Sequence, residues 1–183
     1  MDWTNYLSRT LETLLAVRPA GLDALVTTLH RAREGEHTVF TCGNGGSASA
    51  ASHLAQDLAK GTLLPNSPRM RVVCLCDSLP SITAWANDEG YEHVFAEQLK
   101  SLGRPGDVLI AISGSGNSKN VLHAITAAHH LNMRTWGITG FDGGTLLTLA
   151  HRCIHVACDD MGMVEAAHGV IFHWLIGALR EAR

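Results

Sequence analysis

A turn rich in glycine and serine, followed by a pair of proton-handling side chains, is the most informative stretch of this sequence. Residues 38–42 (TVFTC) are typical of a buried strand, and residues 43–46 (GNGG) then form a turn that tolerates positive φ and lets a ligand approach the backbone. Ser47 occupies the expected N-cap of the next helix, where exposed amides and the helix dipole favour a phosphate group. On that helix His53 and Asp57 are four residues apart and share a face, so they could exchange protons or bind a metal ion.

A second turn of the same kind follows residues 106–113, an apolar run expected to be a central parallel strand. This turn offers the hydroxyls of Ser113, Ser115 and Ser118 and leads into a helix predicted from Lys119. In an open parallel sheet, ligands bind at the carboxyl ends of the strands. Hydroxyls and amides without arginine suit the dianion of a sugar phosphate. One such turn can be an ordinary turn, but two of them after two core strands indicate a binding site.

A dinucleotide site is the alternative interpretation of the first turn. Residues 43–48 match the pattern G-x-G-x-x-A, and Asp77 ends the next predicted strand. Asp77 lies farther downstream than the usual ~20 residues, and the dinucleotide pattern does not require a second serine-rich turn. We therefore expect no nucleotide cofactor.

The last predicted helix, from about Met163 to the end of the chain, carries further candidates. Glu165 and His173 are eight residues apart, which is about 80° around the axis at roughly 3.6 residues per turn, so they can face the same side. The sequence neighbours of His173 are mostly apolar, so we expect its imidazole to be buried, as a core histidine or as a catalytic one. His168 is expected to be structural.

The elements that hold these side chains alternate between strand and helix. After a helical lead-in over residues 1–35, strands are predicted at residues 38–42, 70–76, 106–113, 135–140 and 153–156. This order predicts an α/β fold, a three-layer αβα sandwich with a parallel sheet and a long C-terminal helix. No linker or repeat interrupts the chain, so we expect a single domain over residues 1–183.

Composition narrows the class of protein. With 46% hydrophobic and 17% charged residues, the chain is that of a globular protein. A net charge of −3 gives no reason to expect nucleic-acid binding. We expect no membrane span and no signal peptide, and hence a cytoplasmic location, with the five cysteines reduced.

The two turns together resemble those of the sugar isomerase (SIS) domain, in its phosphoheptose isomerase branch. The likeness covers essentially the whole chain and includes residues 86–88 (AND) and 139–144 (TGFDGG). It implies a flavodoxin-like SIS fold with a five-stranded parallel sheet, and a homotetramer with active sites at subunit interfaces. The implied reaction is the ketose–aldose isomerisation of sedoheptulose 7-phosphate to D-glycero-D-manno-heptose 7-phosphate, by proton transfer through an enediol.

The resemblance also implies roles for individual residues. Asp57, where the family carries a glutamate, and His173 would be the catalytic acid–base pair. Zinc would be held by His53, Asp57, Glu165 and His173. The substrate would be bound by the two turns and by two further segments, through Asn44, Gly45, Gly46, Ser47, Asn87, Asp88, Ser113, Gly114, Ser115, Ser118 and Glu165.

A non-catalytic SIS protein is the alternative function. Such proteins bind phosphosugars or, in one tetrameric relative, the bacterial replication initiator protein. That relative lacks an acidic residue at the position of Asp57, so the carboxylate here favours the enzyme.

Overall fold

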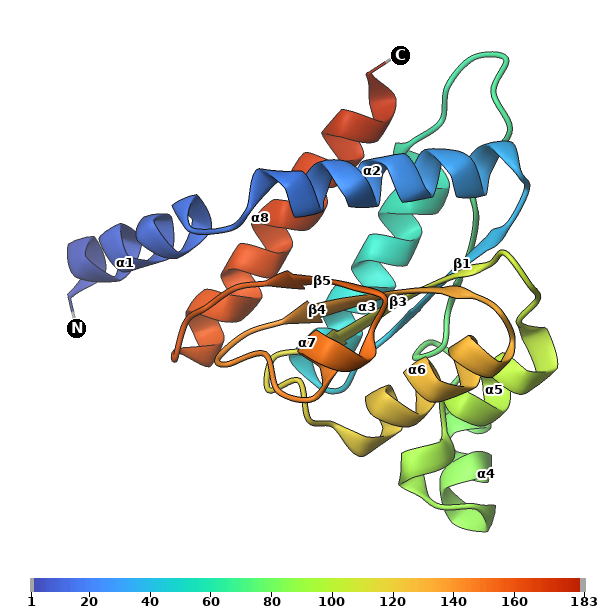
Figure 1. The fold of residues 1–183 in the computed structure, drawn as a ribbon. Helices are drawn as coiled ribbons and strands as arrows, with labels where there is room; N and C mark the ends of the chain where they lie inside the picture. The colour runs from blue at the N-terminus through green and yellow to red at the C-terminus, as the bar shows by residue number, and fades with distance from the viewer. Residues whose placement is uncertain (1, 182–183) are drawn as a thin grey trace.

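The computed structural model describes residues 2–181, and its centre is a five-stranded parallel sheet (Figure 1). The strands are β1 (Thr38–Cys42), β2 (Arg71–Cys74), β3 (Val108–Ser113), β4 (Arg134–Thr139) and β5 (Arg152–His155). They pair in the order β2-β1-β3-β4-β5, with every pair parallel. All six residues of β3 are buried, as its unbroken apolar sequence requires for a strand covered on both faces.

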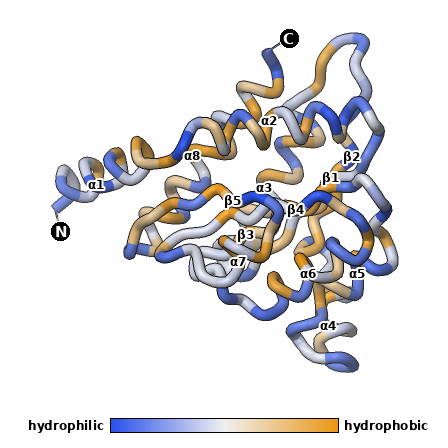
Figure 2. The backbone as a smooth tube through the Cα atoms, viewed as in Figure 1, coloured by the Kyte–Doolittle hydropathy of each residue, from blue (hydrophilic) through white to orange (hydrophobic). Residues whose placement is uncertain are grey.

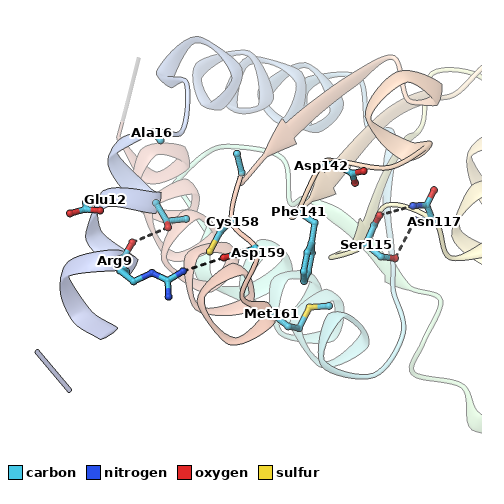
Figure 3. Close-up of a pocket in the computed structure, with 12 residues that line it drawn as sticks. Arg9, Glu12, Ala16, Ser115, Asn117, Phe141, Asp142, Cys158, Asp159 and Met161 are labelled. Carbon is cyan, nitrogen blue, oxygen red and sulfur yellow. Dashed lines mark hydrogen bonds and ion pairs between the residues drawn. The ribbon is translucent and has the colours of Figure 1, made fainter. Parts of the chain in front are cut away.

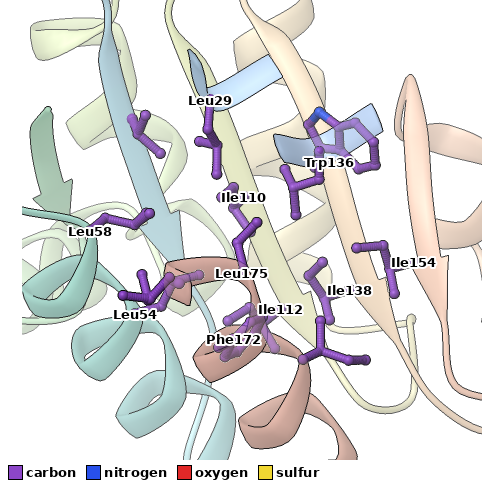
Figure 4. Close-up of a cluster of buried hydrophobic side chains, with 14 of the residues drawn as sticks. Leu29, Leu54, Leu58, Ile110, Ile112, Trp136, Ile138, Ile154, Phe172 and Leu175 are labelled. Carbon is purple, nitrogen blue, oxygen red and sulfur yellow. The ribbon is translucent and has the colours of Figure 1, made fainter. Parts of the chain in front are cut away.

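One face of the sheet is covered by α2 (Pro19–Glu34), α3 (Gly46–Gln56) and α8 (Met161–Arg180). Their apolar stripes meet the sheet in a core that includes Leu29, Leu54, Trp136 and Phe172 (Figure 4). The chain continues from α3 into a π-helical turn at Asp57–Gly61. The polypeptide therefore places α3 and α8 side by side on the sheet, where they can share a site.

The other face carries α4 (Leu79–Asp88), a 3₁₀ turn (Tyr91–His93), α5 (Ala96–Leu102), α6 (Lys119–His130) and the short α7 (Leu146–Leu149). The second core cluster lies there and joins β1 and β3 to α5 and α6. Hydrophobic residues are concentrated in the strands and along α8 (Figure 2). The three-layer αβα prediction is therefore confirmed.

The first helix, α1 (Trp3–Leu15), packs on α8 but extends away from the sheet (Figure 1). Four of its apolar side chains recur every fourth residue and are exposed, namely Trp3, Leu7, Leu11 and Leu15. Within the described part of one chain, this stripe stays exposed, although the Trp3 ring stacks on Tyr6 of the same helix.

Three details differ from the sequence expectations. The second strand ends at Cys74 and not at Cys76, and the helix expected after residues 142–144 is the single turn α7. By length and composition alone, α8 is long and apolar enough to span a membrane, which we did not anticipate. Half of this apolar segment is buried inside the protein, as in a core helix. The helix ends at Arg180, and the last two residues of the expected helix lie outside the described residues.

Candidate active site

The two glycine-serine turns lie next to each other because β1 and β3 are neighbours in the sheet, with Cys42 paired to Ala111. Two side-chain amides join them. Asn44 and Asn120 exchange two hydrogen bonds, each 2.8 Å long between Nδ2 and Oδ1. The Tyr91 hydroxyl donates a third hydrogen bond to Asn44 Oδ1, at 2.9 Å. Asn44 therefore ties the first turn to the helix that follows the second.

The helix after the first turn begins two residues earlier than expected. Gly45, with φ of 54°, is the N-cap of α3, and Ser47 is the second helical residue, so the prediction of Ser47 as N-cap is wrong. The physical reason is that Gly45 adopts a positive φ that serine disfavours. Among the described residues, the amides of Gly46 and Ser47 donate no hydrogen bond within the chain. Both remain free to bind an anion at this helix N-terminus.

The second turn gathers the three hydroxyls expected there. Ser113 and Ser118 share a hydrogen bond of 3.2 Å between their Oγ atoms, and Ser115 Oγ accepts one from the amide of Asn117 at 3.3 Å. Ser118 is the N-cap of α6 but makes no side-chain capping bond. Gly116 closes the turn at φ of 66°, and a Cβ there would collide with the carbonyl oxygen of Gly143. The close packing of this turn against the loop after β4 therefore requires glycine at position 116.

The proton-handling residues meet where α3 and α8 pack together. His53 Nε2 lies 3.3 Å from Asp57 Oδ2, and the rings of His53 and His173 meet edge to face with centroids 5.2 Å apart. One ligand atom from each of the three residues lies within 4.8 Å of the other two. Imidazole nitrogens and a carboxylate oxygen at such spacing can bind zinc or pass a proton.

His173 is exposed, so the expectation of a buried imidazole is wrong. Its apolar neighbours Phe172 and Leu175 point into the core, whereas the side chain of His173 leaves the helix on the side of α3. Residues adjacent in a helix do not share a face, so apolar sequence neighbours do not imply burial. His168 is the buried histidine of α8. Its Nε2 donates to the carbonyl oxygen of Thr139 at 3.2 Å, and burial lowers the pKa of the ring, as suits a structural residue.

Helix α8 also runs past both turns. A Cβ added at Gly46 would meet the carboxyl carbon of Glu165 at 2.7 Å, and one at Gly114 would meet the sulfur of Met161 at 2.7 Å. Glu165 therefore lies against the first turn. It is not a member of the His53–Asp57–His173 cluster, and its role as a zinc ligand stays a prediction.

Asn87 and Asp88 lie exposed at the end of α4, where Asn87 Nδ2 donates to Asp88 Oδ1 at 2.8 Å. Because α4 is on the opposite face of the sheet from α8, this pair is separated from the histidine cluster within one chain (Figure 1). Asn87 and Asp88 are connected to the first turn only indirectly, through Tyr91, which lies three residues beyond Asp88 and donates its hydroxyl to Asn44.

A cavity of about 1000 Å³ opens from the second turn toward α1 (Figure 3). Ser115 and Asn117 line one side, and Arg9, which is 3.1 Å from Asp159, lines the other. Sequence reasoning missed Arg9 and Asn117. Asn117 Oδ1 accepts hydrogen bonds from the amide and hydroxyl of Thr145, each 3.0 Å long, and so fixes the loop after β4. The position of Asn117 inside the second glycine-serine turn could have identified it from the sequence, whereas nothing in the sequence pointed to Arg9.

All five cysteines are free thiols, as expected. Cys76 Sγ donates to the carbonyl oxygen of Gly43 at 3.3 Å, which places a thiol directly behind the first turn. Burial raises the pKa of Cys42, so this thiol stays protonated at neutral pH.

Comparison with known proteins gives consistent matches. The SIS domain family matches residues 2–140. The phosphoheptose isomerase of Helicobacter pylori strain P12 is 39% identical over 175 residues, which cover 96% of this chain and 88% of that protein. The phosphoheptose isomerase of Rhodospirillum rubrum is 38% identical over 164 residues, or 90% of this chain and 86% of that one. The solved structure of a phosphoheptose isomerase from Francisella tularensis superposes with a TM-score of 0.90 at 27% identity and covers 98% of this chain and 95% of its own.

Proposed function

The chain belongs to the SIS domain family, and on that premise we propose that it is a phosphoheptose isomerase, which converts sedoheptulose 7-phosphate to D-glycero-D-manno-heptose 7-phosphate. The observation that carries the proposal is the meeting of His53, Asp57 and His173 beside α8, which also passes the two glycine-serine turns. We infer further that residues 1–183 form a single SIS domain, with residues 1–35 as its helical extension.

The two turns would hold the phosphate group. The free amides of Gly46 and Ser47 and the hydroxyls of Ser113, Ser115 and Ser118 provide donors from two adjacent strand ends. Hydroxyl and amide donors at helix N-termini bind a dianion without a positively charged side chain. With the phosphate fixed, the sugar carbons would extend along α8 past Glu165 and Gly46 toward the histidine cluster.

Asp57 and His173 would carry out the isomerisation between them. One proton leaves C1 of the ketose as the enediol forms and a proton is returned to C2, while a second proton moves from the O1 hydroxyl to O2. A carboxylate and an imidazole are the side chains suited to these transfers near neutral pH. Aspartate reaches one methylene less than glutamate. The π-helical turn that begins at Asp57 changes the local backbone, and such turns occur often at functional sites.

The cluster also fits zinc. The three ligand atoms of His53, Asp57 and His173 lie close enough to share one ion, and nitrogen and oxygen donors are those that zinc accepts. Glu165 would complete the set after a side-chain movement along α8. When bound, zinc would polarise the substrate carbonyl group. The protein groups would still orient the sugar and move the protons.

A homotetramer would cover the surfaces that one chain leaves open. The exposed apolar stripe of α1 needs a partner, and a second copy of the chain would bury it. Assembly would also let Asn87 and Asp88 contact the sugar in a site of a neighbouring subunit, since they are separated from the cluster within their own chain. We place the enzyme in the cytoplasm, where its free thiols would stay reduced.

The test is turnover of sedoheptulose 7-phosphate by the wild type and by His173→Ala, with phosphosugar binding measured in parallel. We expect the wild type to form the aldose and the variant to bind the sugar phosphate but lose turnover. Tight binding without turnover by the wild type would instead support the non-catalytic SIS protein.

A further inference from the structure

A second polar pocket lies at the opposite end of the sheet from the candidate active site. It has a volume of about 690 Å³ and is lined by the first residues of three strands, Val108, Arg134 and Arg152, together with the last turns of α2. The glycine-serine turns follow the carboxyl ends of the strands, so the length of the sheet separates the two sites. This pocket takes no part in the proposed isomerisation.

The lining of this pocket carries an excess of positive charge. Arg31, Arg134 and Arg152 line it, and no aspartate or glutamate does. Within residues 2–181, none of the three guanidinium groups has an ion-pair or hydrogen-bond partner. The nearby carboxylate of Asp107 is buried and already accepts from the amides of Thr38 and Arg104, at 2.7 and 2.8 Å. Three unpaired arginines thus converge in a chain whose net charge is −3.

Ordinary structural roles explain only part of this arrangement. Arg31 is in the last turn of α2, where a positive charge is favourable beside the helix dipole. The guanidinium carbon of Arg152 lies over the Trp136 ring, 6.0 Å from the ring centroid. Arg134 begins β4 and has neither role. Like charges gathered in one concave site repel one another, and a bound anion would remove that cost.

Neutral donors supplement the arginines. Trp136 also lines the pocket, and its indole N–H has no hydrogen-bond acceptor among the described residues. The amide of Thr135 donates to His151 Nδ1 at 3.2 Å, so the neutral ring of His151 carries its proton on Nε2. His37 adds a second imidazole. An anionic ligand would therefore meet donors from α2, β4 and β5 at once.

We propose that this pocket, lined by Arg31, Arg134 and Arg152, binds a small molecule that carries two or more phosphate groups. A single phosphate monoester brings at most about two negative charges at neutral pH, fewer than the three arginines offer. Guanidinium groups also match phosphate oxygens in bidentate geometry. The volume is within the range of about 300–1000 Å³ typical of small-ligand sites and exceeds what one phosphate ion needs.

The experiment is calorimetric titration of the full chain with pyrophosphate and tripolyphosphate at two salt concentrations. We expect binding that weakens as salt rises, because charge pairs are screened. The double variant Arg31→Ala/Arg134→Ala should bind at least about tenfold more weakly, since each charged hydrogen bond contributes at least that factor. All these residues are exposed, so folding should be unaffected.

Two controls make the result decisive. Arg69→Ala/Arg71→Ala removes the same charge from exposed positions outside the pocket and should leave the affinity unchanged. Ser113→Ala/Ser118→Ala weakens the proposed phosphate site at the other end of the sheet and should also leave it unchanged. The proposal is overturned if neither polyphosphate binds, if both arginine pairs weaken binding equally, or if only the serine variant does. Because no substrate is turned over, the outcome is independent of the isomerase proposal.

Discussion

Replacing Asp57 with asparagine would separate a catalytic role of this carboxylate from a structural one. The side chains of His53 and Asp57 are 58% and 22% exposed, and their closest nitrogen and oxygen are 3.3 Å apart. A pair this accessible to solvent contributes about 0–1 kcal/mol to stability. Asp57→Asn should therefore lower the free energy of unfolding by no more than about 1 kcal/mol, measured by urea denaturation.

The effect on turnover should be much larger. Loss of one acid–base group should lower kcat for sedoheptulose 7-phosphate about 10²–10⁴-fold, or roughly 3–5 kcal/mol of activation free energy. KM should change little, because the proposed phosphate contacts come from the two turns and not from Asp57. The assay is direct detection of the aldose phosphate by NMR.

A matched control exists on α5. Glu97 and Lys100 form an ion pair with side-chain exposures of 20% and 58%, nearly those of Asp57 and His53, but they lie outside the candidate site. Glu97→Gln should therefore reproduce the small stability change and keep full kcat. If Asp57→Asn retains more than about a tenth of the wild-type kcat, or if both variants lose activity in parallel, the acid–base role assigned to Asp57 is refuted.

Three further predictions test the phosphate site, the buried histidine and the assembly. Ser113→Ala should raise KM for the sugar phosphate at least about fivefold with a smaller effect on kcat, since it would remove the proposed ground-state hydrogen bond to the phosphate; an unchanged KM in steady-state kinetics would contradict this. Burial lowers the pKa of His168, so below about pH 6.5 the unfolded chain binds a proton that the folded chain does not. The free energy of unfolding should therefore decrease as the pH is lowered, by up to about 1.4 kcal/mol per pH unit. His168→Gln, which keeps a donor for Thr139, should show a shallower loss in urea midpoints between pH 7.5 and 5.5, and an equal loss would show that His168 is not responsible. Leu7→Asp/Leu11→Asp should lower the molar mass measured by light scattering without unfolding the exposed helix α1. An unchanged molar mass would exclude the apolar stripe of α1 as a subunit interface.

The fold could be predicted because each strand is an apolar run and each is followed by a helix. The strand order and the pairing of β1 with β3 needed the structure, since they depend on crossovers that no local pattern specifies. The prediction that two turns would lie together nevertheless followed from general topology, because parallel strands end at one edge.

Errors arose where a local pattern had more than one physical solution. Ser47 has the chemistry of an N-cap, but the positive φ of Gly45 starts the helix earlier. His173 has apolar sequence neighbours, but they lie on other faces of α8.

The contacts of Arg9 with the loop after β5 and of Asn44 with Asn120 were missed for another reason. They join residues far apart in the chain, and only the packed structure brings them together.

Isomerisation of sedoheptulose 7-phosphate in deuterated water tests the central claim most directly, namely that this chain moves a proton between adjacent sugar carbons. We predict that the wild type forms the aldose phosphate and that the product carries solvent deuterium at C2, because an acid–base group at an exposed cluster exchanges its proton with solvent before returning it. The deuterium would be read by NMR and mass spectrometry. Absence of product under conditions where the sugar phosphate binds, or product whose C2 carries only hydrogen transferred from C1 of the ketose, would contradict the account.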